Sequence, residues 1–149
     1  MSKKYLSIFF CLGLFFNTAY AGENYTITGE VTFQNDGDIY ICLYTKEGWQ
    51  NFQIPGHDIS SSNCRHEKMN PELKEAGKLS FKFGNVPKGT YSIIAYQDAN
   101  QNGKVDFKGY TMIEPWGTYK EYPPEIPHPT WSTIKFELNK NISGVTIQM

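Results

Sequence analysis

The chain has 149 residues, and its 14 lysine and arginine residues nearly balance 15 aspartate and glutamate residues, for a formal net charge of −1. That length suits a single domain with one hydrophobic core. The near balance of charge and the lack of basic runs argue against nucleic acid or an anionic lipid surface as a partner.

The first 21 residues are typical of a secretory signal peptide. Lysines at positions 3 and 4 precede an apolar run over about residues 5–16, and Ala-Tyr-Ala at 19–21 is a sequence that signal peptidase accepts. The apolar run is shorter than the roughly 20 residues that a membrane-spanning helix needs. We therefore expect cleavage after residue 21 and a mature chain without a membrane span, periplasmic or secreted from a bacterium.

The mature chain would be one domain over residues 22–149. It retains two cysteines, Cys42 and Cys64. Because an exported chain can meet oxidising conditions, we expect a disulfide between them, with a pair of buried thiols as the alternative.

Two segments near the start of the mature chain predict strands. In "YTITGEVTF" (25–33) apolar and polar residues alternate, and "DIYICLYT" (38–45) follows the turn "NDGD". Asn-Asp-Gly supplies the positive φ angles of a tight hairpin turn. The sequence therefore predicts that these two strands form a β-hairpin.

Residues 46–77 form the least regular part of the mature chain. Within them, residues 71–76 could form one short helix, with Asn70 as its N-cap, Pro71 at the first position and Gly77 just past the end.

Alternating strand patterns resume in "KLSFKF" (78–83), over 90–97, in "STIKFELN" (132–139) and in "GVTIQM" (144–149). The whole pattern predicts an all-β fold: an antiparallel β-sandwich of about six to eight strands, of prealbumin or immunoglobulin type. The period of two selects the residues that should face inward: Ile27, Val31, Ile41, Leu43, Phe81, Ile93, Phe136 and Val145.

Residues 114–131 differ in composition, because five of the chain's eight prolines occur there. Proline cannot donate to a strand ladder, so we expect a long loop rather than a central strand. Its aromatic residues could pack as a lid over one end of the sandwich. Alternatively, they could form a stacking platform for a glycan or protein partner, with the ligand-binding residues Trp116, Tyr119, Tyr122 and Trp131.

The stretch "DANQNGKVD" (98–106) has oxygen-bearing residues at alternate positions, with Gly103 where a sharp turn is needed. An EF-hand loop takes its ligands at positions 1, 3, 5, 7, 9 and 12, with glycine at position 6. Position 12 here is Gly109, so the usual bidentate glutamate is missing. The candidate Ca²⁺ ligands are therefore Asp98, Asn100, Asn102, the Lys104 carbonyl, Asp106 and, to complete the shell, Glu114.

A polar turn without any cation is the alternative interpretation of residues 98–106. Asp, Asn and Gly are also the residues that β-turns select, through bonds from the side chain to the backbone and tolerance of left-handed φ. The sequence leaves both interpretations open.

Residues 83–117, "FGNVPKGTYSIIAYQDANQNGKVDFKGYTMIEPWG", resemble a bacterial exported family known as domain of unknown function 2141. The resemblance implies a prealbumin-type β-sandwich, a loop similar to calcium loops of bacterial surface modules, and no catalytic activity. The positions that match the family pattern are Pro87, Gly89, Tyr91, Asp98, Asn100, Asn102, Gly103, Asp106, Gly109, Glu114 and Gly117.

Signals for an enzyme are absent from the sequence. "HEKMN" (66–70) begins like a zinc-protease helix, but Asn70 stands where the second histidine is needed. No G-x-S-x-G motif or P-loop occurs. We therefore expect a non-enzymatic module.

Overall fold

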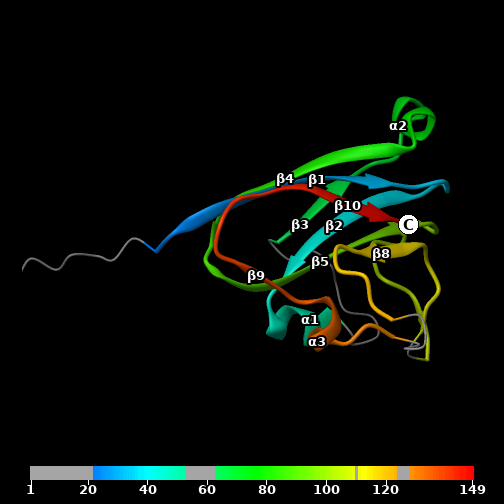
Figure 1. Cartoon of the computed structure of the whole chain (residues 1–149). Coiled ribbons are helices and arrows are strands. Elements are labelled where there is room, and N and C mark those ends of the chain that lie inside the picture. Colours follow the sequence, from blue (N-terminus) through cyan, green and yellow to red (C-terminus); the bar gives the residue numbers. More distant parts are fainter. Residues whose placement is uncertain (1–21, 53–62, 110, 124–127) are drawn as a thin grey trace, which may run out of the picture.

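The computed structural model describes residues 22–52, 63–109, 111–123 and 128–149. Two β-sheets pack face to face (Figure 1). The first sheet has the order β10-β1-β4, with β1 at Asn24–Thr32, β4 at Lys78–Pro87 and β10 at Ile142–Gln148. The second has the order β3-β2-β5-β8, with β3 at Cys64–Glu67, β2 at Asp38–Tyr44, β5 at Gly89–Asp98 and β8 at Trp116–Thr118. The predicted signal peptide lies outside the described residues.

These strands confirm the all-β sandwich. A further strand, β9 (Phe136–Leu138), pairs with the first residues of β5, and a separate ribbon joins β6 (Phe107–Lys108) to β7 (Thr111–Met112). The pairings are antiparallel except between β1 and β10, which run parallel. Alternating patterns cannot predict that exception, because strands of both kinds show the same period of two.

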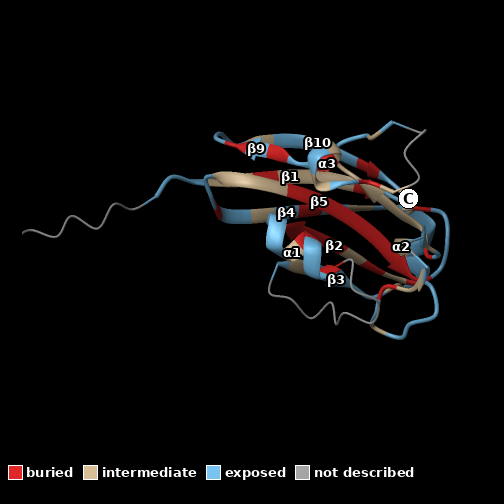
Figure 2. Cartoon of the chain, turned by 90° about the horizontal axis from the view of Figure 1, so that it is seen from below, coloured by how far each residue is buried: buried red, intermediate tan, exposed pale blue. Residues whose placement is uncertain are grey.

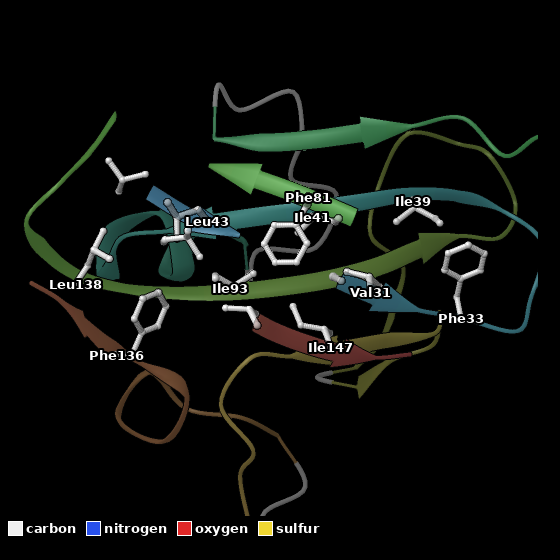
Figure 3. Packing of buried hydrophobic residues seen from close by; sticks show 14 residues of the cluster. Val31, Phe33, Ile39, Ile41, Leu43, Phe81, Ile93, Phe136, Leu138 and Ile147 are labelled. Atoms are coloured by element: carbon white, nitrogen blue, oxygen red, sulfur yellow. The ribbon is translucent and has the colours of Figure 1, made fainter. Parts of the chain in front are cut away.

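The core between the sheets contains all eight residues that the sequence predicted to face inward, each at most 7% exposed. Figure 3 shows several of these side chains meeting between the two layers. Ile39, Ile147 and Leu138 belong to the same cluster. The period-two analysis therefore assigned the faces of these strands correctly.

A second apolar cluster lies on the opposite face of the second sheet. Ile94 and Tyr96 of β5 point into it, and helices α1 (Lys46–Phe52) and α3 (Trp131–Ile134) pack over them (Figure 1). Figure 2 shows that β5 is buried along most of its length. The alternating patterns predict a single inward face for each strand, and they predict neither this cluster nor α1.

The predicted hairpin of residues 25–33 and 38–45 is wrong. β1 pairs with β4 and β10, whereas β2 pairs with β3 and β5, so the two strands belong to different sheets. Gly37 does have the positive φ expected at such a turn, 131°. A turn sequence indicates where the chain bends, but not which strands pair. Here the bend connects a strand of the first sheet to a strand of the second.

The short helix predicted at 71–76 is confirmed as α2 (Pro71–Ala76). The Asn70 side chain accepts a hydrogen bond from the Leu73 N–H, and Gly77 ends the helix with φ 61°. These are the two caps that the sequence indicated. No helix of the described segments is long and apolar enough to cross a membrane.

The predicted disulfide is confirmed between Cys42 of β2 and Cys64 of β3, which lie opposite each other in the ladder. β3 is a four-residue edge strand with mostly exposed side chains, so it has little apolar burial to hold it. The bond closes a sequence separation of 22 residues. In the chain-entropy model a loop of that size contributes about 3 kcal/mol to stability.

Replacing Phe81 with alanine should destabilise the fold by about 3–5 kcal/mol, because it removes a large ring from the closed core and leaves a cavity. Urea denaturation measures the loss. The matched control is Lys82→Ala on the neighbouring, exposed position of β4, which should change stability little. Equal stability of Phe81→Ala and the unmodified protein would mean that the core is assigned to the wrong face.

Candidate metal centre

Asp98 begins the candidate loop as the last residue of β5, with only 1% of its surface exposed. Its two carboxylate oxygens accept hydrogen bonds from the backbone N–H groups of Asn102 (3.0 Å) and Gly103 (2.7 Å). Gly103 has φ 73°, a left-handed angle that glycine adopts without strain. The loop backbone therefore curls around the Asp98 carboxylate.

Asn100, Asn102 and Asp106 form a second layer of bonds in the loop. The Asn100 Oδ1 accepts from the Asn102 N–H (3.1 Å), and the Asn102 Oδ1 accepts from the Lys104 N–H (2.8 Å). Both amide Nδ2 groups donate to the Asp106 Oδ2, at 2.5 Å from Asn100 and 2.9 Å from Asn102. Two partial positive charges thus converge on one carboxylate oxygen.

Glu114 joins the two ends of the loop and is 6% exposed. Its Oε1 accepts from the Ala99 N–H (3.2 Å) and its Oε2 from the Asp106 N–H (3.3 Å). The pairing of β8 with β5, continued by a bond from the Gln97 N–H to the Pro115 carbonyl, sets Glu114 opposite Asp98. Strand pairing therefore brings together two carboxylates that are 16 residues apart in sequence.

The electrostatics of the loop disfavour a charged Glu114. The pKa of its carboxyl group is raised to about 7: burial is the largest cause, the charges of Asp98 and Asp106 act in the same direction, and the two backbone N–H donors only partly oppose these effects. Within the described segments, no lysine, arginine or histidine forms an ion pair with Asp98, Asp106 or Glu114. The negative charge of this cluster has no side-chain counterion there.

The predicted ligand residues lie close together, but their oxygens do not form a coordination shell. Among the described residues, no three Asp, Glu, His or Cys side chains are arranged to hold a metal ion. The amides of Asn100 and Asn102 turn their N–H groups toward Asp106, and Lys104 joins the network through its backbone N–H. A cation would require these amides to turn their oxygens inward, as calcium's preference for oxygen ligands demands.

Gly37 supports the loop from a distant part of the sequence. It is buried, and a Cβ atom added to it would lie 2.7 Å from the Asp98 carbonyl oxygen and 2.8 Å from the Ala99 Cα. Beside it, the Gln97 Nε2 donates to the Asn35 carbonyl (2.7 Å). The sequence did contain a signal, the Asn-Asp-Gly turn, but we interpreted that turn as part of a hairpin.

The four aromatic residues of the alternative site do not form one platform. Trp116 and Tyr122 stack with 5.9 Å between ring centroids and 7° between planes. Tyr119 packs edge-on against Phe136 of the first core, at 5.2 Å. Trp131 begins α3 and packs against the second cluster.

The fold and the loop place the chain in a class of small β-sandwich proteins with an oxygen-rich, acidic loop at one end of the second sheet. A family model described as "Uncharacterized protein conserved in bacteria (DUF2141)" matches residues 30–145. The chain belongs to this family, which confirms the resemblance seen in the sequence. No curated protein and no solved structure matches the chain significantly.

In the absence of divalent cations, the stability that depends on Glu114 should fall as pH rises from about 4.5 to about 7. The folded pKa of about 7 exceeds the ordinary glutamate value of 4.5, so the folded state holds a proton that the unfolded state has released in this window. The stabilisation that the protonated Glu114 provides is fully present below about pH 4.5 and is lost above about pH 7. Urea denaturation in EDTA at pH 5 and pH 8 measures it.

Glu114→Gln removes the titrating group, so the stability difference between the unmodified protein and this variant should change across the same window. Glu75→Gln, at an exposed position of α2, is the control and should show no such change. A pH-independent difference for Glu114→Gln would contradict the assignment of a raised pKa to this carboxyl group.

Gly37→Ala should destabilise the protein, because the new methyl group meets the backbone of Asp98 and Ala99 and because alanine resists φ 131°. Thermal unfolding and amide exchange at residues 98–106 measure the effect. Gly84→Ala is the control, since its added Cβ meets only the flexible end of Lys82, at 3.9 Å. If both variants melt alike, the 33–37 segment does not support the loop.

Proposed function

We propose that this chain is an exported, non-enzymatic β-sandwich module whose loop 98–106 binds one Ca²⁺ ion. The proposed ligands are Asp98, Asn100, Asn102, the Lys104 carbonyl and Asp106, with Glu114 or water completing the shell. The confirmed disulfide fits a compartment that is oxidising. Export itself depends on the predicted signal peptide and cleavage after Ala21.

One observation carries the calcium proposal: the carboxylates of Asp98, Asp106 and Glu114 all accept hydrogen bonds from groups of the loop 98–106, and none of them has a basic partner in the described segments. Buried carboxylates are costly when they are charged and unpaired. A divalent cation would supply the missing positive charge, and it would replace the amide N–H groups that now face Asp106.

The ligand chemistry favours calcium over other metals. Carboxylate, amide and carbonyl oxygens are hard ligands, and the described loop offers no histidine or cysteine that would select zinc or copper. Magnesium demands tighter octahedral geometry and gives up its water reluctantly, so it should bind less well. Without a bidentate glutamate at Gly109, we expect a weak dissociation constant, on the order of 10⁻⁴–10⁻³ M, as in extracellular calcium modules.

A non-enzymatic role agrees with how these carboxylates are used. Asp98 and Glu114 accept hydrogen bonds from backbone N–H groups with both of their oxygens, so these carboxylates hold the loop backbone in place, which supports a structural role. The proposal therefore gives the loop a structural ion and assigns no reaction to the chain.

Calcium titration of the mature protein tests the proposal. Isothermal calorimetry should give a one-site isotherm, and a free concentration ten times the dissociation constant should stabilise the fold by about 1.4 kcal/mol. Magnesium at the same concentration should give a smaller rise in melting temperature. Asp98→Ala should abolish the calcium-dependent rise. Asp106→Asn should also abolish it, while leaving in place the hydrogen bonds that Asp98 accepts from the Gly103 and Asn102 backbone N–H groups.

Asp36→Asn is the matched control, because Asp36 is an exposed carboxylate that pairs with Lys74 outside the loop. Its calcium response should equal that of the unmodified protein. If millimolar calcium gives neither an isotherm nor a rise in melting temperature, residues 98–106 form only a polar turn.

A further inference from the structure

A groove of about 760 Å³ lies where the edge of the second sheet meets the edge of the first. One wall is β8 with the segment that follows it, including Trp116 and Tyr122, and the other is the end of β10, including Thr146 and Gln148. Figure 1 shows these two segments side by side near the C-terminus. The groove is separate from the candidate calcium loop, although β8, which lines the groove, begins only two residues after Glu114.

The wall of the groove combines flat aromatic surface with neutral polar groups. Trp116 and Tyr122 are half-buried and nearly parallel, which fixes their ring orientation. Around them, Thr146 and Gln148 offer hydroxyl and amide groups that both donate and accept hydrogen bonds. The Thr118 hydroxyl donates to the Lys120 carbonyl (2.7 Å), so it offers a ligand only its acceptor lone pairs. Apolar faces bordered by paired donors and acceptors match a sugar ring, which has C–H groups on its faces and hydroxyls at its rim.

Backbone groups of β8 add to this lining. Bonds from the Tyr119 N–H to the Ile93 carbonyl (3.0 Å) and from the Met149 N–H to the Thr32 carbonyl (3.0 Å) turn those residues toward their own sheets. Because backbone direction alternates along a strand, the backbone groups of Thr118 face away from β5. They supply further donors and acceptors at the groove.

The same geometry excludes an extended peptide added as a strand between the two edges. A Cβ atom added to Gly117 would lie 2.2 Å from the Gln148 carbonyl oxygen, so β8 and β10 already touch at this point. An inserted strand would need about 4.7–4.9 Å on each side. β8 also has only three residues, which is too short to align a long peptide.

The charge of the residues that line the groove limits the class of ligand further. Glu121 is the charged residue among those that line the groove in the described segments. Lys120 lies over the Tyr119 ring, 4.7 Å from its centroid, and lines a neighbouring hollow instead. A carboxylate without a lining cation disfavours anionic ligands such as phosphates or uronic acids.

We propose that the groove between β8 and β10 is a binding site for neutral oligosaccharides, with Trp116 and Tyr122 as the stacking surface and Thr146 and Gln148 as hydroxyl-binding residues. The argument for this site does not rest on calcium binding at residues 98–106. Trp131, which belonged to the platform predicted from the sequence, has no part in it.

Calorimetry with three neutral probes, cellohexaose, maltohexaose and chitohexaose, tests the proposal on the mature protein, both in EDTA and in calcium. At least one probe should bind. Trp116→Ala should weaken that binding about tenfold or more, the equivalent of 1.4 kcal/mol. Trp131→Ala is the matched control, because it removes another half-buried tryptophan of the second cluster that does not line the groove.

Gln148→Ala keeps the test decisive should Trp116→Ala fail to fold, as circular dichroism will show. It changes an exposed side chain and should weaken binding, whereas Gln50→Ala, at an exposed position of α1, should not. The proposal is overturned if no neutral probe binds, or if Trp131→Ala weakens binding as much as Trp116→Ala. Tighter binding of hexagalacturonate, or of a decapeptide of alternating serine and threonine, would overturn it as well.

Discussion

The two-sided burial of β5 is the constraint on which the rest of the structure depends. Ile93 and Ala95 face the core between the sheets, while Ile94 and Tyr96 face the second cluster under α1 and α3. This burial has a cost, because the Tyr96 hydroxyl is buried without a hydrogen-bond partner in the described segments, at about 1–3 kcal/mol for such a group. Stacking of the Tyr96 ring on Tyr40, at 5.0 Å and 3° between planes, offsets part of it.

The candidate loop follows from where β5 ends. Side chains alternate along a strand, so Asp98 lies on the same face as Tyr96 and is carried to the margin of the second cluster. A buried carboxylate needs donors, and the following residues supply them by turning back toward it. Val105 then returns to the second cluster, where it is 4% exposed. The loop is thus fixed at both ends by apolar packing and in the middle by a carboxylate.

Local chemistry explains which features the sequence could predict. The capping residues Asn70 and Gly77 act on the backbone next to them, and the period of two depends only on neighbouring residues. The caps of α2 and the first core could therefore be predicted. The D-x-N-x-N-G spacing likewise indicated that the side chains of residues 98–106 meet. The pairing partner of each strand could not be predicted from the sequence, because strand pairing depends on how whole sheets pack. For that reason the 33–37 turn was assigned to a hairpin, and its contact with Asp98 through Gly37 was missed.

β8 has a larger role than its three residues suggest. Its pairing with β5 sets Glu114, two residues before the strand, beside the loop, and Trp116, the first residue of the strand, beside the groove. A strand this short has few ladder bonds of its own, so its position also depends on the Glu114 bonds to Ala99 and Asp106. A change in the charge of Glu114 therefore acts on the strand that supports Trp116. The loop and the groove can bind different ligands and still depend on one small piece of backbone.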